Sequence, residues 1–133
     1  MLPLRYPRLW RFADILILVL VLASAMSPEM WPWGRTSGPY LVSDKVMHGL
    51  TFAFLALWYT GQYSRKSYAK LAVGLLLFGV LIELCQLMVS YRSAEWGDLL
   101  ADSIGVAVGM AIAMTVTGGW SQAVERRFSS QHE

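Results

Sequence analysis

Four long apolar runs set the strongest limit on how this chain can fold. They cover residues 9–26, 46–63, 71–89 and 99–116. A helix needs about 20 apolar residues to cross roughly 30 Å of hydrocarbon, and each run approaches that length. Only 15% of the residues are charged, whereas soluble domains contain about 25%. We therefore expect an all-α integral membrane bundle of four transmembrane helices.

The connections between the runs leave no room for a second domain. The sequence shows no internal repeat or low-complexity tract, and a polar segment follows the last run. We expect one transmembrane domain over residues 1–133, with residues 117–133 as a polar cytoplasmic tail. The net charge of +2 is small and dispersed, which argues against a nucleic-acid partner. The single cysteine, Cys85, lies in an apolar run and supports neither a disulfide framework nor a cysteine-based metal site.

The positions of the basic residues predict the orientation of the bundle, because Lys and Arg gather in cytoplasmic segments. Eight of the eleven basic residues lie before or at the start of the first run, between the second and third, or after the fourth: Arg5, Arg8, Arg11, Arg65, Lys66, Lys70, Arg126 and Arg127. We expect both termini in the cytoplasm. A signal peptide cleaved after Ala25 is an alternative for the first run. Asp14, near its cytoplasmic end, is expected to reach water or pair with Arg11.

Polar residues collect at the predicted outer ends of the second, third and fourth runs. The candidate binding residues are Asp44, Lys45, His48, Glu83, Gln86, Arg92, Asp98 and Asp102. Several of them stand three or four residues apart and therefore share a helix face. A rise of about 1.5 Å per residue places them at similar depths. Since acidic residues at membrane depth usually face a cavity or a partner, we expect one outward-facing polar pocket.

The face that carries Asp102 continues with small residues. Gly105, Gly109 and Ala113 follow at helical spacing. Small residues at this spacing let a neighbouring helix approach closely. We therefore expect the aspartate-bearing face to point into the bundle and away from lipid.

The chemistry of these residues leaves three interpretations open. They can bind a ligand, they can catalyse a reaction with His48, Glu83 or Asp98 as candidates, or they can form structural ion pairs with Arg92 or Lys45. Histidine and carboxylate side chains are residue types that bind metals, but one histidine with scattered carboxylates lacks a recognised metal-binding spacing. No nucleophile elbow is present. We expect no metal and no cofactor.

The same residues carry a resemblance to a known family. Their order along the chain is Asp44-Lys45-x-x-His48, Glu83-x-x-Gln86, Arg92, Asp98, then Asp102-x-x-Gly105-x-x-x-Gly109. As a set, this resembles the VanZ-like family of small membrane proteins, named for a teicoplanin resistance protein. The resemblance covers residues from about Asp44 to Gly109. It departs at Asp102, where the family usually has Asn.

The resemblance implies a four-helix domain in the bacterial inner membrane, part of the cell envelope, and an effect on antibiotic susceptibility in the namesake. We expect the pocket to bind or modulate an envelope lipid or a glycopeptide-type ligand. One alternative is a membrane enzyme acting on a lipid-linked envelope precursor, with His48 or Glu83 as acid or base. Another is a structural helper of a membrane complex. A transporter is disfavoured, because the polar residues stop on the outer side.

Overall fold

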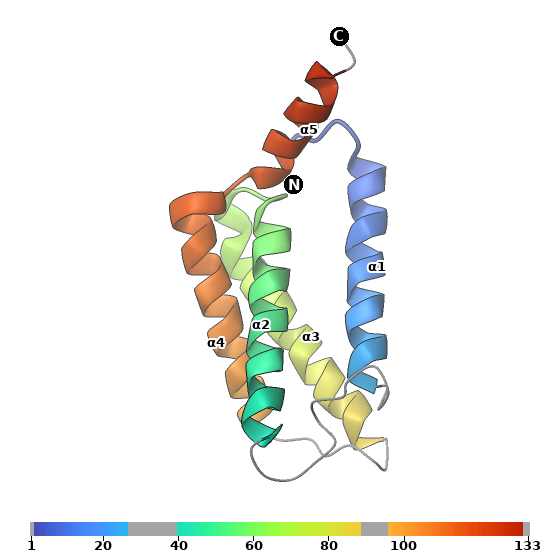
Figure 1. The fold of residues 1–133 in the computed structure, drawn as a ribbon, viewed down its shortest axis with the longest axis vertical. Coiled ribbons are helices and arrows are strands. Elements are labelled where there is room, and N and C mark those ends of the chain that lie inside the picture. Colours follow the sequence, from blue (N-terminus) through green and yellow to red (C-terminus); the bar gives the residue numbers. More distant parts are fainter. Residues whose placement is uncertain (1, 27–39, 89–95, 132–133) are drawn as a thin grey trace.

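The computed structural model describes residues 2–26, 40–88 and 96–131, and it is helical through most of them. The α-helices are α1 (Pro7–Met26), α2 (Tyr40–Thr60), α3 (Tyr68–Leu87), α4 (Trp96–Ile112) and α5 (Trp120–Ser130). A 3-10 turn, η2 (Arg65–Ser67), precedes α3, and a π-helical segment, η3 (Ala113–Thr117), follows α4. Figure 1 shows α1 to α4 forming a bundle, with α5 at one end of it. The all-α class is confirmed.

The lengths and surfaces of the helices fit a membrane setting. Three stretches are long and apolar enough to span a bilayer, namely Pro7–Met26, Arg65–Leu87 and Trp96–Val116. Within α2, the shorter stretch Val46–Thr60 is also an apolar helix. Large apolar side chains such as Leu9 of α1 are exposed on the bundle surface. In a bilayer these side chains contact lipid, so the chain is a multi-pass membrane protein. Its orientation stays a prediction.

Small residues let α2 and α4 pack closely. A Cβ added at Gly105 would lie 2.2 Å from the carbonyl oxygen of Gly49, and one at Gly109 would lie 2.6 Å from that of Ala53. Real side chains do not tolerate such distances, so these positions of α4 need glycine. The small-residue face of α4 therefore points into the bundle, as expected from the sequence.

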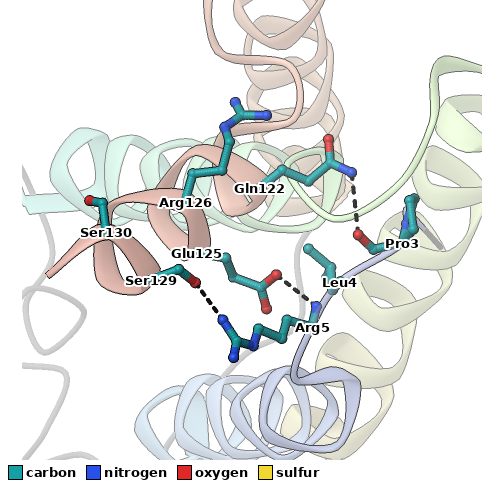
Figure 2. A pocket seen from close by; sticks show the side chains of 8 residues that line it. All are labelled: Pro3, Leu4, Arg5, Gln122, Glu125, Arg126, Ser129 and Ser130. Carbon is teal, nitrogen blue, oxygen red and sulfur yellow. Dashed lines mark hydrogen bonds between the residues drawn. The ribbon is translucent and has the colours of Figure 1, made fainter. Parts of the chain in front are cut away.

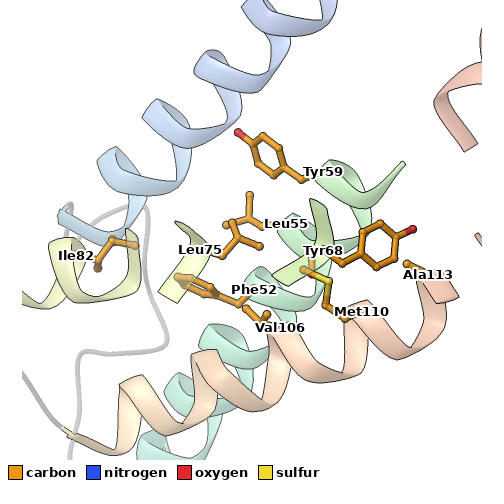
Figure 3. Close-up of a cluster of buried hydrophobic side chains, with 11 residues drawn as sticks. Phe52, Leu55, Tyr59, Tyr68, Leu75, Ile82, Val106, Met110 and Ala113 are labelled. Carbon is orange, nitrogen blue, oxygen red and sulfur yellow. The ribbon is translucent and has the colours of Figure 1, made fainter. Parts of the chain in front are cut away.

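The apolar core lies where α2, α3 and α4 meet. Figure 3 shows Phe52 and Leu55 of α2 together with Leu75 of α3 and Val106 of α4. Phe52 follows His48 by one helical turn, so the core begins directly beside the polar residues of α2. The core thus fixes the relative positions of the three helices that carry the candidate site.

The segment expected as a polar tail contains helix α5, which holds the N-terminal segment in place. The backbone N–H of Arg5 donates to Glu125 Oε2 at 2.7 Å, and the indole N–H of Trp10 donates to Glu125 Oε1 at 2.9 Å. The backbone N–H of Leu2 donates to the carbonyl of Gln62 at 2.7 Å. Consequently the N-terminal segment, the end of α2 and α5 lie at the same end of the bundle (Figure 1).

Candidate functional site

A histidine of α2 lies between two aspartates of α4. His48 Nδ1 is 3.0 Å from Asp102 Oδ1, and His48 Nε2 is 3.8 Å from Asp98 Oδ2. All three side chains are buried. The neighbour of His48, Gly49, is the residue whose carbonyl packs against Gly105. The close approach of α2 and α4 at these glycines therefore brings the imidazole within reach of both carboxylates.

Glu83 joins this group from α3. One donor atom from each of His48, Glu83 and Asp98 lies within 4.8 Å of the other two, and Glu83 is only 6% exposed. One imidazole and two carboxylates are ligand types that divalent cations use in proteins. By type and proximity these side chains can hold such a cation, although the sequence shows no recognised spacing. The expectation of no metal stays a prediction.

The Asp102 carboxylate also faces α3. A Cβ added at Gly79 would lie 2.8 Å from Asp102 Oδ2 and 3.3 Å from the ring of Phe52. Any side chain at position 79 would therefore displace the carboxylate or the ring. Asp102 accordingly contacts both α2 and α3. We call His48, Glu83, Asp98 and Asp102 the ionisable cluster.

Gln86 shares a helix face with Glu83, and its side chain connects α3 to α1. Its Nε2 donates to the carbonyl of Ala25 at 3.2 Å, near the end of α1, and the side chain is buried. This contact anchors the end of α1 against α3. The sequence prediction that Gln86 binds a ligand remains open.

Three predicted site residues cannot be placed beside the cluster. Asp44 and Lys45 belong to α2, but the structure does not describe their side chains, and Arg92 lies outside the described residues. The predicted ion pairs of Arg92 and Lys45 therefore also lie outside the described part of the chain.

A second buried polar group, missed by sequence reasoning, lies toward the other end of the bundle. Asp14 of α1 is buried, and its Oδ1 accepts hydrogen bonds from Trp58 Nε1 at 2.8 Å and Gln62 Nε2 at 2.7 Å. The Tyr59 hydroxyl donates to its backbone carbonyl at 3.1 Å. The expectation that Asp14 reaches water or pairs with Arg11 is therefore wrong. The four-residue spacing of Trp58 and Gln62 was the available signal.

Comparison with known proteins identifies the family. A family model described as VanZ/LLP1 matches residues 12–117. No curated protein and no solved structure matches the chain. The family match extends beyond the region of resemblance to include most of α1, and it contains both Asp14 and the ionisable cluster. Because it covers well over half of the sequence, the chain belongs to the VanZ/LLP1 family.

Proposed function

We propose that this VanZ/LLP1 membrane protein binds a ligand of the bacterial cell envelope through the ionisable cluster. The observation that carries the proposal is the burial of four ionisable side chains from three helices, in which three carboxyl groups lie around His48. Removing such groups from water is costly, and ionisable residues at membrane depth are usually functional. Three of the four are carboxylic acids, so together they offer many hydrogen-bond acceptors in a small space.

The position of the cluster gives a ligand a short route to it. Asp98 lies in the first turn of α4, next to the predicted boundary of the membrane. A ligand from the outer surface or the outer leaflet can therefore approach without crossing the apolar core. Lipid-linked envelope precursors and glycopeptide-type molecules carry hydroxyl, amide or ammonium donors that match carboxylate acceptors.

The proposed location is the bacterial inner membrane, with the ionisable cluster on the outer side. Most basic residues lie at one end of the bundle, the end where α5 and the N-terminal segment are also found. The positive-inside rule supports a cytoplasmic position for that end. Asp98 and the start of α4 lie at the opposite end of the bundle, which supports an outward-facing site.

A second candidate function is catalysis on a lipid-linked envelope precursor. The observation that favours it is the 3.0 Å contact between His48 Nδ1 and Asp102 Oδ1. A carboxylate that accepts from one imidazole nitrogen orients the ring and leaves the other nitrogen to take up or release a proton. In this structure the other nitrogen, Nε2, faces Asp98. Turnover of a lipid-linked substrate with a bell-shaped pH profile, lost in His48→Gln, supports this candidate.

The binding proposal is tested by lipid profiling of the purified protein. Wild type is compared with Glu83→Gln, which replaces one carboxyl group of the cluster with an amide, and with Asp14→Asn, the same kind of change at a buried carboxyl group near the other end of the bundle. We expect wild type and Asp14→Asn to retain an enriched envelope lipid. We expect Glu83→Gln to lose that lipid while it inserts into the membrane and keeps its melting temperature in detergent.

Two results contradict the proposal. If Glu83→Gln fails to accumulate in the membrane, the cluster is structural, and the structural helper becomes the better interpretation. If Glu83→Gln folds and retains the same lipids as wild type, the ligand does not bind at the cluster. Glycopeptide susceptibility of cells that express the three proteins then shows whether binding affects antibiotic response.

A further inference from the structure

A cavity of about 600 Å³ lies between the N-terminal segment and α5. Figure 2 shows side chains from both segments around it. Its polar lining consists of Arg5, Gln122, Glu125, Arg126, Ser129 and Ser130. This cavity is separate from the ionisable cluster, and no residue of it contributes to the proposed function.

The length of α1 places the cavity just outside the hydrocarbon layer. The helix begins at Pro7 and contains 20 residues. At about 1.5 Å per residue it extends about 30 Å, which is the thickness of the hydrocarbon core. Residues before Pro7, including Arg5, therefore lie at the level of the lipid headgroups, where phosphate groups are found.

The charges around the cavity favour an anion. Two arginines line it against one acidic residue, Glu125, and both oxygens of that carboxylate already accept hydrogen bonds. Oε2 accepts from the backbone N–H of Arg5, and Oε1 accepts from the indole of Trp10. Glu125 is therefore satisfied within the protein and competes weakly for a further cation.

Arg126 is the residue best able to contact an anion. Its side chain is exposed, and Figure 2 shows its guanidinium directed away from both the Glu125 carboxylate and the Arg5 guanidinium. Across the residues that the structure describes, this guanidinium forms no hydrogen bond or ion pair. Arg5, by contrast, donates from Nη1 to Ser129 Oγ at 2.9 Å, so its guanidinium is held at the cavity. Guanidinium groups suit phosphate because their planar donors match its oxygens.

The first turns of α1 offer exposed apolar side chains to acyl chains. Leu9 and Phe12 of α1 are exposed, and they lie within the first turns of the helix after Pro7. A lipid whose headgroup occupies the cavity can place its chains along these residues. A free phosphate ion gains nothing from them, so the surroundings favour a lipid.

We propose that the cavity between the N-terminal segment and α5 binds the phosphate of an anionic phospholipid, with Arg126 as the guanidinium that contacts it and Arg5 as a second positive charge in the lining. The acyl chains of this lipid lie along the exposed face of α1. The bound lipid thus contacts both ends of the described chain and ties α5 to the membrane surface.

The test measures lipid binding to the full-length protein in detergent by native mass spectrometry. The probes are phosphatidylglycerol, phosphatidylcholine and water-soluble glycerol phosphate. Arg126→Gln is compared with Arg127→Gln, which removes the same charge from the neighbouring residue that does not line the cavity. We expect phosphatidylglycerol to bind more tightly than the other two probes. We expect Arg126→Gln to weaken it about fivefold, and Arg127→Gln to change it less than about twofold.

Three outcomes overturn the proposal. If Arg126→Gln and Arg127→Gln weaken phosphatidylglycerol binding equally, the lipid is attracted by the overall positive charge at this end of the bundle and not by the cavity. Equal binding of phosphatidylcholine would show that the anionic charge is not recognised. Binding of glycerol phosphate as tight as that of phosphatidylglycerol would show a site for a free anion. Melting temperatures of both variants in detergent confirm that each is folded when it is measured.

Discussion

His48 Nδ1 lies 3.0 Å from Asp102 Oδ1, and this contact joins α2 to α4 across 54 residues of sequence. The second oxygen of Asp102 lies against Gly79 of α3. One buried carboxylate of α4 therefore contacts two other helices, α2 and α3. Its ability to accept a hydrogen bond from His48 and its small size both matter for the structure around it.

We predict that Asp102→Asn is tolerated in both folding and function. The amide oxygen of Asn can accept the hydrogen bond from His48, and its size suits the space beside Gly79. Asp102→Ala leaves the imidazole N–H without this acceptor, which costs about 1 to 3 kcal/mol. Thermal unfolding in detergent should show a melting temperature near wild type for Asn and several degrees lower for Ala. Equal losses would show that the carboxylate charge itself is required.

We predict that Gly105→Ala destabilises the bundle and Gly74→Ala does not. The new methyl group at position 105 would meet the carbonyl oxygen of Gly49 at 2.2 Å, so α2 and α4 would have to separate. Such overpacking costs about 1 to 3 kcal/mol. A Cβ at Gly74 has no neighbour within 4 Å, and alanine favours the helix. Melting temperatures of the two variants test this. An unchanged value for Gly105→Ala would contradict the close packing of α2 and α4.

The sequence predicts the helices and much of the ionisable cluster, because both depend on local spacing. Helix length fixes the depth of each residue, and the four-residue spacing of Asp98 and Asp102 places them on one face. The small residues after Asp102 indicate which face points inward. The depth of each residue in the membrane and the direction of its helix face together are enough to predict that Asp98 and Asp102 lie close to His48. The individual distances are not predictable.

Local spacing places Trp58 and Gln62 on one helix face, but it does not say that this face meets Asp14 of another helix. The partners of Glu125 are likewise set by contacts between distant segments. Glu125 accepts a hydrogen bond from Trp10, which is 115 residues away in the sequence. This contact requires helix α5, and the polar composition of that segment does not predict a helix. Gln86 illustrates a different limit. It shares a face with Glu83, yet its amide contacts the backbone of Ala25. A backbone carbonyl is available at every residue, so sequence offers no means of choosing this partner.

We predict that Asp14→Ala is destabilising and that Asp14→Asn is much less so. Trp58 and Gln62 both donate to Asp14 Oδ1, and alanine would leave two buried donors without this acceptor. Each such loss costs about 1 to 3 kcal/mol, whereas the amide oxygen of Asn can still accept. The yield of folded protein and its melting temperature in detergent measure the difference. Similar behaviour of the two variants would mean that these hydrogen bonds contribute little.

Glu125 is predicted to make stability depend on pH. Burial raises the pKa of this carboxyl, but hydrogen bonds from Arg5, Trp10 and Tyr6 and the positive charge of Arg5 outweigh it, so the pKa lies below its ordinary value of 4.5. The carboxylate therefore stabilises the folded state above about pH 4.5, and this contribution is lost as the pH falls through the folded-state pKa.

The Glu125 prediction is measured with Glu125→Gln, which resembles the protonated acid. We expect wild type to melt at a higher temperature than the variant near neutral pH, with the difference shrinking in acid. A difference that stays constant from about pH 7 to pH 3 would contradict the proposed origin.

We predict that both termini lie in the cytoplasm, and the contact between the N-terminal segment and α5 supports a location on the same side of the membrane. The backbone of Arg5 donates to Glu125, so the N-terminal segment and α5 cannot be separated by a membrane. The clustering of basic residues at this end favours the cytoplasm. A reporter fused after Glu133 should be active only in its cytoplasmic form, and a reporter inserted between Thr36 and Gly38 only in its periplasmic form. Periplasmic activity of the reporter at the C-terminus would show that the orientation is the reverse of the predicted one. A mature chain that starts at Met26 would show that α1 is cleaved off and is not part of the bundle.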